Sequence, residues 1–163
     1  MVALSIMGLS WCQHAGWTVV LYDGRRRRRL QITLRLEDAL TVGQELSGHR
    51  TDQTDLYQLV GAVLKRQPDL ASVTLGHGGR NRASTAVVVH TDEGPVRYPT
   101  STAVGVALAV RAGLPIVADE ALMEACGVAD EPEPRAHGEP PEGTPIPRAF
   151  HLALVDPPEP ESY

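Results

Sequence analysis

The chain is poor in the residues that would mark several common functions. Its 163 residues include two cysteines, and Cys12 and Cys126 lie 114 positions apart, which is no metal-ligand spacing. Arginine outnumbers lysine 14 to 1, an imbalance that reports codon composition more than chemistry. Nothing before the first predicted strand resembles a signal peptide, so we expect a reducing, cytoplasmic location. No apolar run is long and uncharged enough to span a bilayer, and we therefore expect no membrane partner.

Charge and proline divide the chain into two parts. Residues 1–130 hold 13 Arg or Lys and 13 Asp or Glu, whereas residues 131–163 hold two Arg, seven acids and nine of the 13 prolines. We therefore expect a compact domain over 1–130 and a disordered, acidic, Pro-rich tail over 131–163, with residues 150–155 (FHLALV) as its one docking segment. The balanced domain produces no general field, so binding of nucleic acid would need a local basic patch.

Residues 102–128 (TAVGVALAVRAGLPIVADEALMEACGV) carry the clearest structural pattern. The Ala-rich and Val-rich run 102–112 predicts a helix that ends at a left-handed cap on Gly113, and Pro115 forbids its continuation. A short buried strand follows. Asp119 can then cap a second helix, which we expect to end at Gly127.

The rest of the domain reads as strands in runs and helices in groups. Alternating polarity and turn residues predict strands, including a hairpin at Asp23-Gly24, and apolar residues at helical spacing predict two further helices. The predicted strands cover 2–8, 17–22, 30–34, 70–75, 83–90 and 95–98, and the predicted helices cover 36–46 and 54–66. This order predicts an α+β fold in one compact domain, with a mixed sheet of about six to seven strands and about four helices.

Three local sequences and the element order resemble one known family, the third being the helix from Asp119-Glu120 through Gly127. Residues 30–39 (LQITLRLEDA) lie where bifunctional-nuclease domains of bacteria and plants carry Leu-Pro-Ile-Trp-Ile-Gly-x-x-Glu-Ala, and residues 111–116 (RAGLPI) match their Arg-x-Gly-x-Pro-Ile. The chain resembles this family over residues 1–128. The resemblance implies a homodimer that hydrolyses phosphodiester bonds of DNA or RNA.

The departures from the family pattern fall on its polar residues. The family's Arg-Pro-Ser-Asp coincides with residues 101–104, so Val104 stands at the acidic position. The histidine of the family's Thr-His-Asp, expected near residues 53–55, is missing. Only Asp38 stands where the family carries a carboxylate, there a glutamate. Two functions follow from this: a nuclease with degenerate motif residues, or a non-catalytic dimeric binding or regulatory protein that retains the fold.

A nuclease would need carboxylates that hold a divalent metal ion or move a proton. The candidates are Asp38 and Asp55 as catalytic residues, with Asp38 and Asp52 as metal ligands. Asp52 and Asp55 also stand where the N-terminus of a helix favours acids, and capping is the alternative interpretation of both.

The run GRRRRRL offers a local basic patch. On a strand, alternation would place Arg25, Arg27 and Arg29 on one face, where they and Arg35 could contact a nucleic-acid backbone without sequence preference. The alternative is a solvated hairpin arm whose charges prevent strand-to-strand aggregation.

Overall fold

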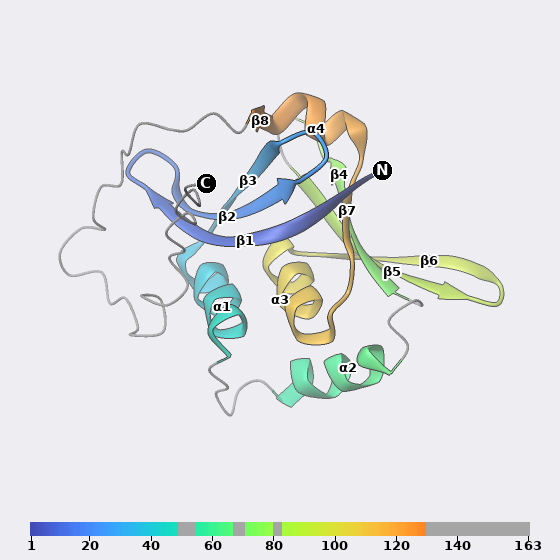
Figure 1. Cartoon of the computed structure of the whole chain (residues 1–163). Coiled ribbons are helices and arrows are strands. Elements are labelled where there is room, and N and C mark those ends of the chain that lie inside the picture. Colours follow the sequence, from blue (N-terminus) through green and yellow to red (C-terminus); the bar gives the residue numbers. More distant parts are fainter. Residues whose placement is uncertain (49–54, 67–70, 80–82, 130–163) are drawn as a thin grey trace, which may run out of the picture.

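The computed structural model describes residues 1–48, 55–66, 71–79 and 83–129, with side chains described for all of these except 55–58. This part of the chain forms one mixed sheet of eight strands with four helices, and the predicted α+β class is confirmed (Figure 1). The tail expected over 131–163 lies outside the described residues. The strands are β1 (Val2–Cys12), β2 (Gly16–Asp23), β3 (Arg28–Leu34), β4 (Ala71–His77), β5 (Ala83–Thr91), β6 (Gly94–Thr100), β7 (Ile116–Ala118) and β8 (Gly127–Ala129). The helices are α1 (Leu36–Ser47), α2 (Asp55–Lys65), α3 (Thr102–Ala112) and α4 (Glu120–Cys126).

The sheet has the strand order β6-β5-β4-β7-β1-β2-β3-β8, in which only the pair of β4 and β7 is parallel. Strand β8 exceeds the predicted count of six to seven. Gly127 ends α4 as predicted, but with φ −75° and ψ 127° it also begins β8, which the sequence did not predict. β8 pairs with β3 from Arg28 to Leu30, a long-range contact that local sequence cannot show.

Strand β1 forms the centre of the sheet and bends along its length. Its first residues alternate as predicted, with Val2 and Leu4 buried and Ser5 exposed. A bulge between Ile6 and Gly8 shifts the register with β2. Such a bulge increases local twist, which lets one continuous strand serve both halves of the sheet.

The helices form layers on the sheet. Helices α1 and α3 lie on one side and α4 on the other (Figure 1). Helix α3 is buried along most of its length, because Ala and Gly let it approach the strands closely. A Cβ on Gly105 would lie 2.8 Å from Cγ2 of Thr85, a distance that leaves no room for one. In the described ranges, the longest helix has 12 residues, fewer than the roughly 20 that a bilayer requires.

Candidate functional site

The run of arginines divides between a turn and a strand. Strand β2 ends at Asp23 and β3 begins at Arg28, so residues 24–27 form the turn of the hairpin, and three of its four residues are arginines. Side-chain alternation therefore does not place Arg25, Arg27 and Arg29 on one strand face. The left-handed residue of the turn is Arg27, with φ 51°, and neither residue of the predicted Asp23-Gly24 turn has a positive φ.

A buried carboxylate shapes this turn. Asp23 has 1% of its surface exposed, and its Oδ1 accepts hydrogen bonds from the backbone N–H of Arg25 at 2.9 Å and of Arg26 at 3.3 Å. An aspartate that accepts from the backbone two or three residues later is a standard stabiliser of turns. The turn thus has a defined backbone, and the direction of its side chains follows from it.

Two of the arginines attach the hairpin to α4. Arg26 forms an ion pair with Glu120 in the first turn of that helix. Arg28 donates from Nη1 to the backbone carbonyl of Met123 at 3.4 Å. Both side chains of the ion pair are about half exposed, so the pair contributes little to stability. Glu120 nevertheless compensates the positive charge of Arg26, which leaves this arginine less available to a phosphate.

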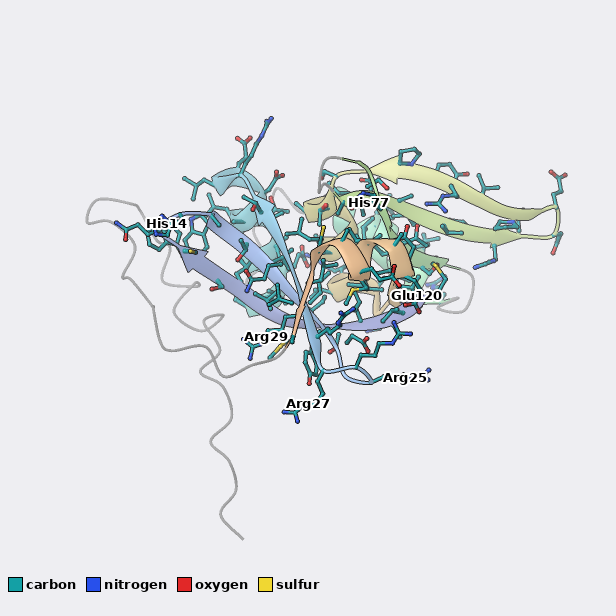
Figure 2. All side chains as sticks on the ribbon, turned by 90° about the horizontal axis from the view of Figure 1, so that it is seen from above. His14, Arg25, Arg27, Arg29, His77 and Glu120 are labelled. Atoms are coloured by element: carbon teal, nitrogen blue, oxygen red, sulfur yellow. The ribbon has the colours of Figure 1, made fainter. Side chains whose placement is uncertain are left out.

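The remaining turn arginines project into solvent. Arg25 and Arg27 are exposed, and neither has an ion-pair partner in the part of the chain that the structure describes. Figure 2 shows both at the tip of the hairpin, directed away from the sheet, with Arg29 farther along β3. Arg29 is half-buried. The candidate nucleic-acid interface therefore consists of two exposed guanidinium groups, those of Arg25 and Arg27, carried by one turn of defined backbone.

Arg35 lies far from this turn. It precedes α1 at the other end of β3, seven residues from Arg28, which is about 23 Å along a strand. Its side chain is 84% exposed, and its Nη1 lies 3.8 Å from Oε1 of Glu37. The structure does not bring Arg35 together with Arg25 and Arg27.

The carboxylate site suggested by the family pattern falls on the first turns of α1 and α3. The two helices run in the same direction (Figure 1), and Arg111 near the end of α3 is paired with Glu45 near the end of α1. Asp38, in the first turn of α1, and Val104, in the first turn of α3, consequently lie at the same end of the helix pair. Val104, the position predicted to align with the family's aspartate, shares this end of the helix pair with Asp38 but has a hydrocarbon side chain.

The groups around Val104 have structural roles. The backbone N–H of Val104 donates to Oγ of Ser101, the cap of α3, at 3.2 Å. Thr85 and Thr102 share a hydrogen bond of 2.9 Å between their hydroxyl groups. Within the described ranges, no three His, Cys, Asp or Glu side chains are grouped so that they could hold a metal ion.

The other predicted carboxylates do not join Asp38. Asp55 begins α2, and Gly61 of this helix packs against the side chain of Arg111 near the end of α3. Helix α2 therefore lies beyond the C-terminal ends of α1 and α3, whereas Asp38 lies at their N-terminal ends (Figure 1). The side chain of Asp55 and the whole of Asp52 lie outside the described residues. The described backbone thus separates the two residues predicted to be catalytic.

A second polar cluster lies where β4 ends. Asp119 accepts from the N–H of His77 at 3.0 Å, and a Cβ on Gly76 would lie 3.0 Å from Oγ of Ser84 and 3.2 Å from Oδ2 of Asp119. These residue types would suit a nucleophilic triad. However, Ser84 pairs with Gly76 and His77 with Ala83, so the side chains of Ser84 and His77 lie on opposite faces of the sheet. Oδ1 of Asp119 caps α4 through the N–H of Leu122 at 2.6 Å, as predicted, and its role here is structural.

Sequence reasoning found the arginines but not the residues that position them. Asp23 was identified only as part of a hairpin signal, and Glu120 was assigned no role. The Asp-Gly dipeptide is the one local signal that could have assigned the buried acceptor, because aspartate bonds the backbone of its own turn. In comparisons with known proteins, no family model matches the chain and no curated protein is similar to it.

Proposed function

We propose that this protein is a non-catalytic relative of the bifunctional-nuclease domains, which binds the backbone of single-stranded DNA or RNA through Arg25 and Arg27. The observation that carries the proposal is that the arginines of this run have two different environments. Arg26 and Arg28 hold the hairpin on α4, whereas Arg25 and Arg27 are exposed on a turn fixed by buried Asp23.

The chemistry of these two groups fits phosphate. A guanidinium is always charged and offers a planar set of donors that matches phosphate oxygens. Each phosphate it neutralises releases condensed counterions, which drives binding without reading sequence. Because Asp23 already orders the turn, little backbone entropy is lost on binding.

The resemblance also supports a nuclease, with Asp38 as the residue that would hold a divalent metal ion. In that case Asp38 would need a second carboxylate nearby, because one carboxylate neither balances the double charge of Mg²⁺ or Mn²⁺ nor fixes the position of the ion. Val104 at the same end of the helix pair supplies none, and Asp55 starts α2 beyond the opposite end. We therefore favour binding over hydrolysis.

A homodimer and a cytoplasmic location complete the proposal. The homodimer is implied by the family resemblance, and multi-angle light scattering tests it. The cytoplasmic location is supported by two free cysteines, Cys12 exposed and Cys126 half-buried, which suit a reducing compartment.

The test is an equilibrium titration of a fluorescent single-stranded oligonucleotide with the full chain. The double variant Arg25→Gln, Arg27→Gln should bind about tenfold more weakly or worse, because a charge-assisted hydrogen bond contributes about 1.5–3 kcal/mol. A control variant, Arg35→Gln with Arg66→Gln, removes the same charge from exposed sites elsewhere and should bind like the unaltered protein. Equal weakening in both double variants would show a general charge effect and overturn the assignment. Metal-dependent cleavage of the oligonucleotide by the unaltered chain would overturn the non-catalytic part.

A further inference from the structure

An apolar groove runs between α2 and the hairpin of β5 and β6, over the side of α3. Its volume is about 310 Å³. Volumes of this size are at the lower end of those that hold small ligands. Its principal lining residues are Val60, Leu64, Val87, Val89, Tyr98 and Leu108. None of these carries a charge, so the groove suits hydrocarbon.

Two of the elements that line the groove, α2 and β6, expose large apolar side chains. Leu59 is 65% exposed, Val63 62%, Tyr98 56% and Val96 39%. These are four of the eight exposed large apolar residues in the described part of the chain, and all four belong to α2 and β6. A concentration of exposed apolar surface beside a groove indicates a site that another apolar segment covers.

The occupant does not extend the sheet. β6 is an edge strand, and it carries Pro95 and Pro99, which pair with His90 and Ala86 of β5. Because a proline has no N–H, it is accommodated in an edge strand with its nitrogen facing away from the partner strand. Backbone groups of alternate residues point to the same side of a strand, so Pro95, Arg97 and Pro99 all face away from β5. Of these three, only Arg97 has an N–H. This stretch of the edge thus offers few backbone donors, and a covering segment would bind mainly through side chains.

We propose that residues 150–155 of this same chain (FHLALV) cover the groove. They are the one apolar segment of the 34 residues that follow Ala129. Pro147 and Pro157 flank them closely, which disfavours a helix. In an extended conformation Phe150, Leu152 and Leu154 share one face, the arrangement that an apolar groove would bind.

The length of the connecting chain permits this contact. β8 ends at Ala129 on one edge of the sheet, and the groove borders β6 at the other edge. Seven strand spacings of about 4.8 Å put the two edges ~34 Å apart across the sheet, and any offset along the strands adds to this. Residues 130–149 can span up to ~66 Å when extended. A tethered segment has an effective concentration in the millimolar range, so a weak intrinsic affinity is sufficient.

The charges around the groove favour the same occupant. Lys65 and Arg66 follow Leu64 directly at the end of α2, and both are exposed. In the tail, Asp156 follows the apolar segment directly. Binding of the segment would bring the carboxylate of Asp156 near the positively charged side chains of Lys65 and Arg66. Opposite charges attract more strongly as the distance between them falls.

The test uses Phe150 as a unique probe, because it is the only phenylalanine of the chain. In the full chain, with phenylalanine and methyl groups labelled, nuclear Overhauser contacts should join the Phe150 ring to methyl groups of Val87, Val89 or Leu108. The variant Leu152→Asp, Leu154→Asp should lose these contacts. The matched variant His151→Asp, Ala153→Asp adds the same charges on the opposite face of the segment and should keep them.

Two results would overturn the proposal. One is the absence of contacts from the Phe150 ring to the groove in the unaltered chain. The other is contacts that appear only between differently labelled copies and strengthen with concentration, since a second molecule would then be the occupant. Neither outcome depends on nucleic-acid binding, so this test is independent of the proposed function.

Discussion

Arg111 and Glu45 form a buried, two-pronged ion pair that joins the ends of α3 and α1. Nη2 of Arg111 lies 2.6 Å from Oε1 and its Nε lies 2.7 Å from Oε2, with the side chains 10% and 5% exposed. The hydrogen bonds to Glu45 raise the pKa of Arg111 above its ordinary value, burial opposes this, and the charge of Glu45 adds to the rise. A raised pKa stabilises the fold at every pH below the ordinary value, so the contribution of Arg111 does not fade within the usual range of pH.

Breaking this pair from one side should be costly. Glu45→Ala leaves a buried guanidinium without its partner, and we expect a loss of about 3–5 kcal/mol in the free energy of unfolding. The double variant Glu45→Leu, Arg111→Met replaces both charges with hydrocarbon and should lose much less. Urea unfolding followed by circular dichroism measures both. Equal losses in the two variants would mean that the pair is not desolvated as the structure has it.

Gly61→Ala should destabilise the protein although alanine favours helix. A Cβ at Gly61 would lie 2.5 Å from Cγ of Arg111, whose side chain is held by Glu45 and cannot move aside freely. Overpacking of this kind costs about 1–3 kcal/mol, against about 1 kcal/mol gained in helix propensity. In an Arg111→Ala background the clash disappears, and Gly61→Ala should then be neutral or stabilising. A destabilisation that persists in that background would refute the proposed clash.

Asp23 should link stability to nucleic-acid binding. Asp23→Ala removes the buried acceptor of two backbone N–H groups, which we expect to cost about 1–3 kcal/mol and to loosen the turn that presents Arg25 and Arg27. Asp23→Asn retains a carbonyl acceptor and should lose less stability and less affinity for the oligonucleotide. Thermal melts and oligonucleotide titrations of the two variants check this. Unchanged affinity in Asp23→Ala would show that the order of the turn is irrelevant to binding.

Asp38→Asn should leave any cleavage of nucleic acid at its background level. Asp38 lies in the first turn of α1, and Val104, in the first turn of α3 at the same end of the helix pair, can neither bind a cation nor transfer a proton. The measurement is a time course of oligonucleotide degradation with Mg²⁺ or Mn²⁺, for the unaltered protein and the variant prepared identically. Turnover that Asp38→Asn abolishes would establish a nuclease site different from the family's.

The predictable parts of the fold are those fixed by local chemistry. Gly113 has φ 71° and caps α3 as its sequence predicted, and Asp119 caps α4 with its side chain. Both outcomes depend on residues within a few positions of one another. The α+β class followed in the same way, from the grouping of strands and helices along the chain.

The parts that sequence missed depend on distant residues. The partner of Arg111 is Glu45, 66 positions away, and no local pattern joins the two. Strand β8 exists because β3 offers an edge for it, which local pattern cannot reveal. Likewise, strand periodicity could not show that Asp23 is buried and that Arg25, Arg26 and Arg27 therefore lie in a turn and not on a strand. The position of a turn depends on which side chains the flanking strands bury.

The dependence of binding on salt tests the central claim most directly. If Arg25 and Arg27 each neutralise one phosphate of a single strand, replacing both with Gln should reduce the slope of log affinity against log salt concentration by about 1.4. The control variant Arg35→Gln, Arg66→Gln should keep the slope of the unaltered protein. A slope unchanged in Arg25→Gln, Arg27→Gln, or no binding by the unaltered chain at low salt, would contradict a nucleic-acid interface at this turn.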